Sequence, residues 1–226
     1  MDSIKIITTE DGSHSLYHEG LKETYHSFHG AMQESVHVFI EKGIRFWRTK
    51  SGLPKTVDIF EVGFGTGLNA LLAAQFAMEN EVKINFTSVE PFPLDLDIIN
   101  QLNYAQLIGQ DKFKTVFKEL HLAEWDKTVE IDPYFSVHKV KSKLEDFQTV
   151  DKFDVLFFDA FAPSKQAELW TADLLEKCHN LLKEGGVFTT YSAKGQLKRD
   201  LKSVGFEVET LPGPPGKKEM VRGVVR

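Results

Sequence analysis

The sequence has little of several features that define particular classes of protein. It contains one cysteine among 226 residues, which excludes a disulfide framework and a cysteine-based zinc site. No apolar run approaches the ~20 residues that a membrane-spanning helix needs. The first five residues lack the basic and apolar regions of a signal peptide. We therefore expect a soluble, cytoplasmic protein with no membrane partner.

The sequence also lacks an overall positive charge. Its formal net charge is -6 at pH 7, so the total does not suggest a nucleic-acid partner. The distribution is uneven, because eight Lys or Arg but only four Asp or Glu follow position 193. This basic C-terminal part is compatible with binding to a phosphate backbone and equally with an ordinary solvated surface, and charge alone does not separate the two.

A metal site is not expected. Five of the eight histidines precede position 38, and His26 and His29 have the spacing of a metal pair on one helical turn. No Cys ligand and no glutamate-flanked His-x-x-x-His helix supports such a site. We expect instead that this segment lies over a ligand, with Tyr25, His26 or Ser27 reaching it.

From position 56 onward, short β-branched or apolar runs alternate with helical patterns. This alternation predicts an α/β fold with a parallel sheet that is covered on both faces. We expect strands at residues 56–62, 83–90, 135–140, 153–159, 187–191, 206–211 and 220–225, and helices at 68–78, 94–107, 111–127, 167–182 and 195–204. The last two strands have no helix between them, so they predict an antiparallel hairpin that completes a seven-stranded, mostly parallel sheet.

The first 55 residues are polar and irregular, with one short amphipathic helix predicted at 34–47. We expect two parts, an N-terminal extension at 1–55 that packs over the cofactor site and an α/β domain at 56–226. Ligands of open α/β sheets bind at the carboxyl ends of the strands, at the topological switch point. The chemistry is therefore expected at Gly63, Glu90 and Asp159.

Three glycines at alternate positions, Gly63, Gly65 and Gly67, follow the first predicted strand and open a helix. Glycine permits positive φ and lets a ligand approach the backbone. The spacing differs from the dinucleotide fingerprint Gly-x-Gly-x-x-Gly. With Glu61 before the turn, it resembles motif I of the Rossmann-like class I methyltransferases, which use S-adenosylmethionine (SAM) and direct this acid at the methionyl ammonium. Glu90 at the next strand end suits the two hydroxyls of a ribose.

A further carboxylate, Asp159, ends the most apolar of the predicted strands. A charge at that place is costly unless it is paired or functional. Methyl transfer to an amine requires an aligned nucleophile whose lone pair carries no proton, and Asp159 can accept a hydrogen bond from an amine. The nearby Phe161 ring is suited to stacking on a flat base. Capping of the loop by Asp159 and simple packing of Phe161 are the structural alternatives.

Several segments together resemble the MnmC-type tRNA methyltransferase family. The glycine motif is generic to class I methyltransferases, whereas the Asp-Ala-Phe-Ala-Pro loop and the basic Pro/Gly tail are much more specific. The resemblance runs through most of the chain and is carried by Trp170 and by residues 20–25, 61–69, 158–163, 190–195, 205–208 and 213–220.

The resemblance implies SAM-dependent methylation of the aminomethyl group on carbon 5 of the tRNA wobble uridine, which gives 5-methylaminomethyl-2-thiouridine. It implies Asp159 as the residue that holds the amine, with Phe161 as the second catalytic candidate. The expected cofactor-binding residues are Tyr25, Glu61, Gly63, Gly65, Gly67, Asn69, Glu90, Ser142 and Asp159. The expected RNA-binding residues are Lys194, Arg199, Lys217 and Lys218.

Two departures from the family pattern affect these expectations. In many members this domain is joined to an FAD-dependent oxidoreductase that makes the amine, but the sequence has no Gly-x-Gly-x-x-Gly unit. We therefore expect no FAD and a separate enzyme that supplies the aminomethyl substrate. The family commonly has an acid for adenine after the third strand, where this chain has Ser142. Either Ser142 replaces that acid, or Glu145 or Asp146 reaches the base.

Two other functions fit parts of the sequence. A polyamine aminopropyltransferase-like enzyme also carries an acid at the second strand end and an acidic loop after the fourth strand, but it does not explain the basic tail. A non-catalytic tRNA-binding protein would keep the fold, but it has no reason to place Asp159 at the end of the central strand.

Overall fold

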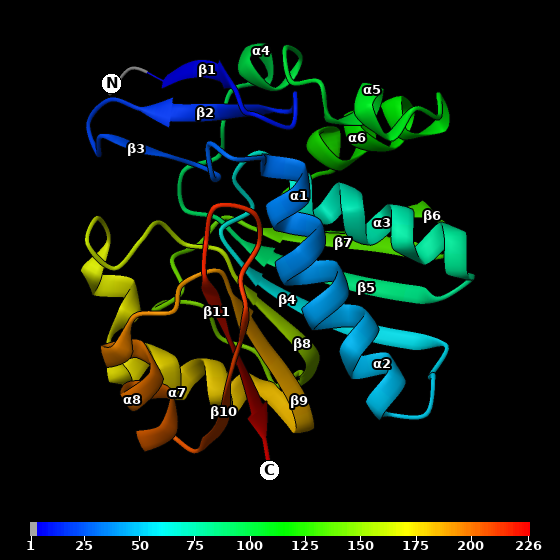
Figure 1. Ribbon diagram of the computed structural model, residues 1–226. Coiled ribbons are helices and arrows are strands. Elements are labelled where there is room, and N and C mark those ends of the chain that lie inside the picture. Colours follow the sequence, from blue (N-terminus) through cyan, green and yellow to red (C-terminus); the bar gives the residue numbers. More distant parts are fainter. Residues whose placement is uncertain (1–3) are drawn as a thin grey trace.

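The computed structural model describes residues 4–226, and a large sheet between two layers of helices forms its main body (Figure 1). Its strands are β4 (Thr56–Val62), β5 (Lys83–Val89), β6 (Thr128–Asp132), β7 (Phe135–Val140), β8 (Phe153–Phe158), β9 (Leu182–Thr190), β10 (Phe206–Pro212) and β11 (Glu219–Val225). They lie in the order β10-β11-β9-β8-β4-β5-β7-β6. Residues 1–3, on which the expectation of no signal peptide partly rests, lie outside the described residues.

The sheet confirms the predicted mostly parallel arrangement and the C-terminal hairpin. Strands β4, β5, β7, β8 and β9 pair in parallel, whereas β10 and β11 pair antiparallel. The prediction of seven strands was wrong, because β6 adds an eighth at the edge, antiparallel to β7. Its sequence, Thr-Val-Glu-Ile-Asp, is short and none of its residues is buried, so it has little of the apolar signal that marks the inner strands.

Helices cover both faces of the sheet (Figure 1). One face carries α3 (Leu68–Asn80), α6 (Lys112–Leu122) and the continuous helix formed by α1 (Ala31–Ser35), η1 (Val36–Arg45) and α2 (Phe46–Lys50). The other carries η2 (Ala167–Trp170), α7 (Ala172–Leu181) and α8 (Gly195–Ser203). Two short helices, α4 (Leu96–Ile99) and α5 (Tyr104–Ile108), replace the single helix predicted at 94–107. The helix predicted at 167–182 is divided into η2 and α7, and β9 begins at Leu182, earlier than the strand predicted at 187–191.

The inner strand β8 is apolar at nearly every position because helices cover both of its faces. Val155 and Phe157 face the cluster that includes η1 and α3, whereas Leu156 and Phe158 face the cluster that includes α7 and α8. All six residues of β8 are buried. Side chains alternate between the two faces of a strand. When helices cover both faces, the odd-numbered and the even-numbered positions of the strand must therefore both be apolar.

The N-terminal part is more regular than expected. It contains a three-stranded antiparallel sheet of β1 (Ile4–Thr8), β2 (His14–His18) and β3 (Glu23–Thr24). The helix predicted at 34–47 extends from Ala31 to Lys50, and its middle part, η1, has the wider π-helical pattern. Gly43 on η1 faces the sheet, where a Cβ atom would lie 3.2 Å from the Phe157 ring. The absence of a side chain therefore lets this helix approach β8 closely.

The strand order places a switch point at β4. The chain leaves β4 toward β5 on one side and later returns to β8 on the other. Val62 pairs with Val89 of β5 and with Phe158 of β8, so the three strands end at the same level. Gly63, Glu90 and Asp159 directly follow these three residues and are therefore brought together, as the sequence predicts.

Candidate active site

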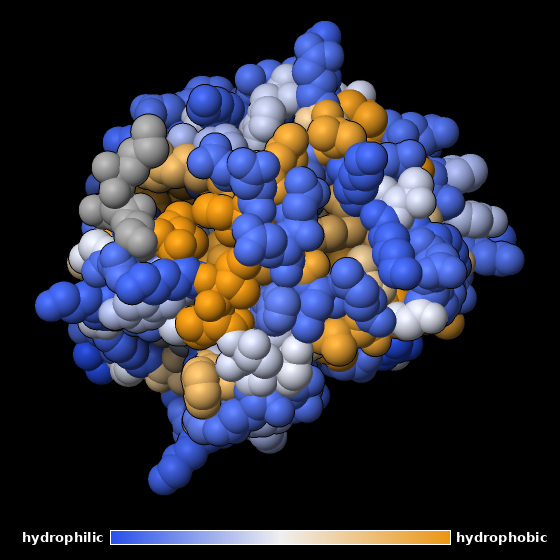
Figure 2. Space-filling view, turned by 90° about the horizontal axis from the view of Figure 1, so that it is seen from above, coloured by the Kyte–Doolittle hydropathy of each residue, from blue (hydrophilic) through white to orange (hydrophobic). Residues whose placement is uncertain are grey.

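A pocket of about 940 Å³ opens at the carboxyl ends of β4, β5 and β8. The glycine turn forms its floor, and the loops after β5, β7 and β8 and the N-terminal segment form its walls. Figure 2 views the molecule from the side of the small sheet and α4, and shows hydrophobic surface interspersed with hydrophilic groups there. Of the expected cofactor residues, Tyr25, Gly63, Gly65, Asn69, Glu90 and Asp159 line the pocket. Such a mixed lining suits a ligand with apolar and polar parts.

The glycine turn has a backbone that only glycine adopts readily. Gly63, Gly65 and Gly67 all have positive φ, at 92°, 48° and 72°, a region that costs other L-residues free energy. At Gly63 a Cβ atom would lie 3.1 Å from the carbonyl oxygen of Asp159. Gly67 is not among the described pocket residues, and a Cβ there would lie 2.7 Å from Nε2 of His121. Gly67 therefore shapes the turn from behind.

Glu90 is fixed by two backbone donors. Its Oε2 accepts the N–H of Gly65 at 3.1 Å and its Oε1 accepts the N–H of Phe92 at 2.8 Å. Burial raises the pKa of Glu90, and the two backbone hydrogen bonds oppose that shift. A carboxylate has about four acceptor positions, so Glu90 keeps acceptor capacity for a pair of ligand hydroxyls.

Asn69 links two carboxyl groups. Its Nδ2 donates to Oε1 of Glu61 at 3.0 Å and to Oδ2 of Asp159 at 2.8 Å. Glu61 is 1% exposed, and its other oxygen accepts the Ser88 hydroxyl at 2.7 Å. Burial raises the pKa of Glu61 well above its usual range. Glu61 is not among the described residues that line the pocket, whereas Asn69 is; Asn69 thus lies where the acid was expected to face the ligand.

The same amide provides a test of whether the pocket fits a sulfonium nucleoside with an amino-acid tail. The Asn69 Oδ1 atom is buried and has no hydrogen-bond partner. A buried acceptor without a donor is costly, and a ligand ammonium group would satisfy it. Together with the Glu90 acceptors and the open glycine backbone, this orphaned atom means that the residues present fit SAM.

The third carboxyl group, Asp159, also has a raised pKa. Burial, followed by the charge of Glu34, raises its pKa to about 7, while Asn69 and Lys217 oppose the shift. Asp159 also lines the pocket. A carboxyl group with this pKa is suited to exchanging a proton near neutral pH.

Aromatic rings form one wall of the pocket beside Asp159. Phe161 contacts Tyr25 edge to face at a ring-centroid distance of 5.0 Å and His18 at 6.2 Å. The indole N–H of Trp170 donates to the Phe161 carbonyl oxygen at 2.8 Å. That carbonyl oxygen therefore accepts a hydrogen bond within the fold, and Phe161 lines the pocket.

Comparisons with known proteins identify the family and the fold. Residues 104–226 match the model of a family described as S-adenosyl-L-methionine-dependent methyltransferase. The chain belongs to this methyltransferase family. The predicted class I methyltransferase fold is thereby confirmed.

Curated relatives indicate which methyltransferases the chain resembles most specifically. The chain is 32% identical, over 89% of its length, to the tRNA 5-methylaminomethyl-2-thiouridine biosynthesis bifunctional protein MnmC of Marinomonas sp. (strain MWYL1). It is 29% identical, over 92% of its length, to the protein of that name from Campylobacter hominis. The chain spans 31% of the length of each relative. The predicted resemblance to an MnmC methyltransferase domain is confirmed.

Solved structures show the same fold. MNMC2 from Aquifex aeolicus superposes with a TM-score of 0.81 at 24% identity, covering 100% of this chain and 71% of that one. Spermidine synthase from Thermotoga maritima superposes with a TM-score of 0.60 at 16% identity, covering 100% of this chain and 69% of that one. At these identities the likeness concerns the fold alone.

The segment after β7 contributes to the methyltransferase pocket through Glu145, one of the expected alternatives, but not through Ser142. Lys141, Lys143 and Glu145 line the pocket. Ser142 is not among the described lining residues, and its hydroxyl donates to the carbonyl of Lys143 at 2.9 Å. Of the alternatives left open for the adenine contact, Glu145 is the acid that the structure brings to the pocket.

The four expected RNA-binding residues differ in their surroundings. Lys194, Arg199 and Lys218 are exposed. Lys198 of α8 pairs with Glu219 at the start of β11 at 2.7 Å, so α8 lies next to the end of the loop that carries Lys218. Lys217 is only 29% exposed at its side chain, and its ammonium group pairs with Glu34 within the chain.

Sequence reasoning missed Glu34 and Tyr191, which lie close to the methyltransferase pocket through long-range contacts. No sequence pattern singled out Glu34, because helical spacing places it opposite the apolar positions of the predicted helix at 34–47, yet only 5% of it is exposed. Within residues 4–226, no group of three or more His, Cys, Asp or Glu side chains is arranged to hold a metal ion. In the same range, no helix is long and apolar enough to cross a membrane.

Proposed function

We propose that this methyltransferase transfers a methyl group from SAM to the aminomethyl group on carbon 5 of the tRNA wobble uridine, converting 5-aminomethyl-2-thiouridine to 5-methylaminomethyl-2-thiouridine. The observation that carries the proposal is the position of Asp159, an acceptor with a pKa of about 7 in the pocket beside the glycine turn. The names of the MnmC relatives support this choice of nucleoside.

In this proposal, the floor of the pocket holds the methyl donor. The carboxylate of Glu90 accepts the ribose hydroxyls, and the open backbone at Gly63 and Gly65 lets the donor approach closely. The orphaned Oδ1 of Asn69 accepts from the methionyl ammonium group, with Glu61 behind it holding the amide in place. SAM, when bound, supplies a methyl group on a positively charged sulfur.

The loop after β8 holds the acceptor. Asp159 in its ionised form takes one proton from the substrate ammonium group, which frees the nitrogen lone pair for the new nitrogen–carbon bond as the methyl–sulfur bond breaks. Phe161 and Tyr25 provide ring faces and edges against which the pyrimidine packs. Alignment of the nitrogen accounts for most of the expected rate enhancement, because the methyl group is already activated.

We further propose that the protein contacts tRNA through exposed cations and that its N-terminal part covers the cofactor. Exposed Lys194, Arg199 and Lys218 contact tRNA phosphates, which bind cations without regard to sequence. A separate enzyme in the same cytoplasmic compartment supplies the aminomethyl nucleoside. Residues 1–55 act as an extension over the cofactor site, supported by the pocket-lining positions of His18, Tyr25 and His26.

The test is transfer of tritium from methyl-labelled SAM. We expect incorporation into tRNA that carries 5-aminomethyl-2-thiouridine, with the methylated nucleoside identified by mass spectrometry, and none into tRNA that already carries the methyl group. Aminopropyl transfer from decarboxylated SAM to putrescine would instead indicate the polyamine alternative. SAM binding by calorimetry without any transfer would indicate a non-catalytic protein.

A further inference from the structure

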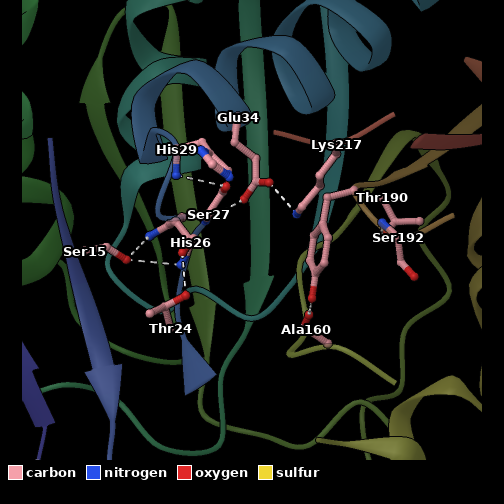
Figure 3. Close-up of polar contacts among 11 residues, drawn as sticks. Ser15, Thr24, His26, Ser27, His29, Glu34, Ala160, Thr190, Ser192 and Lys217 are labelled. Atoms are coloured by element: carbon pink, nitrogen blue, oxygen red, sulfur yellow. Dashed lines mark hydrogen bonds and ion pairs between the residues drawn. The ribbon is translucent and has the colours of Figure 1, made fainter. Parts of the chain in front are cut away.

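Glu34 of α1 connects two distant parts of the chain near the pocket. The residue is buried, with only 5% of its surface exposed. One oxygen, Oε1, accepts the N–H of Ser27 at 3.0 Å, and the other, Oε2, lies 2.5 Å from the ammonium nitrogen of Lys217 (Figure 3). Ser27 ends the segment that carries Tyr25 and His26 into the pocket. Glu34 therefore ties the N-terminal wall of the pocket to the loop between β10 and β11.

Lys217 continues this connection to the opposite wall. Its ammonium nitrogen lies 3.9 Å from the centroid of the Tyr191 ring, a distance typical of a cation–π contact. The Tyr191 hydroxyl donates to the carbonyl oxygen of Ala160 at 2.9 Å. Ala160 stands between Asp159 and Phe161, so Tyr191 anchors the backbone of the loop that we propose holds the acceptor.

The contacts close into a ring, because the two walls also meet each other. Tyr25 and Phe161 touch edge to face at 5.0 Å. A displacement of either wall would therefore strain contacts on the other side of the ring. Buried polar groups connected in this way restrict one another more than isolated pairs do.

The charges of the ring also reach the reacting group. Glu34 raises the pKa of Asp159, whereas Lys217 lowers it. The pair thus lies within electrostatic range of the carboxyl group, although neither side chain is among the described residues that line the pocket.

We propose that Lys217, acting with Glu34 and Tyr191, is a positioning residue that holds the Tyr25 and Phe161 walls of the acceptor site in register. This inference rests on the proposed role of the loop after β8. It gives Lys217 a place inside the active-site framework instead of a contact with tRNA phosphate. The exposed neighbour Lys218 remains the phosphate-binding candidate of this loop.

The test compares Lys217→Met and Tyr191→Phe with the wild-type protein. Tyr191→Phe removes only the hydroxyl group that donates to the Ala160 carbonyl oxygen. It therefore keeps the proposal testable if Lys217→Met folds poorly. Lys217→Arg retains the cation as a rescue variant. Lys118→Met and Tyr134→Phe, at exposed positions, are the matched controls, and Lys218→Met reports the effect of losing a phosphate contact.

Two readouts are measured for each variant. Amide hydrogen exchange of residues 159–166 reports directly on the loop and needs no tRNA. Steady-state methyl transfer and SAM affinity report on function. We expect faster exchange and a kcat about tenfold lower in Lys217→Met and Tyr191→Phe, SAM affinity within about twofold of wild type, substantial recovery in Lys217→Arg, and no change in the two controls.

Specific outcomes would overturn the inference. Wild-type exchange and kcat in both Lys217→Met and Tyr191→Phe would do so. The inference would also be overturned if Lys217→Met behaved like Lys218→Met, that is, if it weakened the salt dependence of tRNA binding and left kcat unchanged. If the wild-type protein transfers no methyl group to the aminomethyl tRNA, the proposed function fails, and the exchange measurement still decides whether Lys217 holds the loop.

Discussion

At the scale of single residues, three carboxyl groups within one site differ in what surrounds them. Glu61 is sealed between Ser88 and Asn69, and Glu90 is held by two backbone donors. Asp159 accepts one amide proton of Asn69 and lines the pocket. Since environment determines which carboxyl group exchanges protons, Asp159 is the one suited to an amine.

We expect Asp159→Ala to lower methyl transfer at least about hundredfold, while SAM affinity changes little. The reason is that the substitution removes the acceptor for the amine but leaves Glu90 and the glycine turn intact. Single-turnover transfer and calorimetric SAM titration measure the two quantities, with Asp151→Ala as an exposed control. A parallel loss of SAM affinity would instead make Asp159 a structural or cofactor-binding residue.

The pKa of Asp159 predicts a pH dependence. Burial chiefly raises it to about 7, and the proposed role needs the ionised form, so kcat/KM is expected to rise with pH through about 7 and to fall below it. The pH–rate profile of the wild type measures this limb. If the same limb persisted in the residual activity of Asp159→Ala, it would belong to the substrate amine.

The sequence predicted those side chains that follow directly from strand ends. Gly63, Glu90 and Asp159 come together because the paired parallel strands β4, β5 and β8 all end at the same edge of the sheet. The pairing of Glu34 with Lys217 follows from no local pattern, because 183 residues separate them. The position of Asn69 in front of Glu61 depends on how α3 leaves the turn, which spacing alone does not specify.

At the scale of elements, the glycine turn and α3 depend on the packing behind them. Gly67 precedes α3 with φ of 72° and faces His121, whose ring also lies near Phe64. Burial lowers the pKa of His121 to about 3, so its ring is neutral at pH 7 and packs against the turn without charge.

We expect Gly67→Ala to weaken SAM binding about tenfold or more and to lower the unfolding temperature. Gly109→Ala is the matched control, because Gly109 has a similar φ of 77° but open space around its Cβ position. Both variants carry the cost of positive φ, about 1–2 kcal/mol, and only Gly67→Ala adds the clash with His121. Equal effects of the two variants on SAM affinity would show that crowding behind the turn is unimportant.

The elements that the sequence predicted well are those with strong apolar periodicity. Strand β8 is buried on both faces and is apolar throughout, whereas β6 has no buried residue and was missed. The small sheet was missed because β2 contains two histidines and a serine among five residues, and because β3 has only two residues. In such strands, local pairing outweighs the apolar pattern.

At the scale of the whole molecule, the basic residues are concentrated after position 193, and the Lys198–Glu219 pair joins α8 to the start of β11. The total charge of -6 would repel tRNA, so binding requires this local cationic surface. Association with a polyanion should therefore depend strongly on salt.

We expect the double variant Arg199→Gln with Lys218→Gln to reduce the slope of log affinity for tRNA against log salt by about 2, since each phosphate contact contributes about 1. Filter binding between low and moderate salt measures the slope. The control is Lys83→Gln, at the end of β5 that lies away from the pocket. An unchanged slope in the double variant would remove this surface from the tRNA interface.

The contact between Glu34 and Lys217 has a consequence for biosynthesis. A ribosome releases the residues of the donor side, Gly63 and Glu90, long before it releases Lys217. The ring around the proposed acceptor loop can therefore close only after Lys217 has been translated. Co-translational ordering of that loop must wait for the loop between β10 and β11, whereas the strand ends that carry Gly63 and Glu90 emerge much earlier.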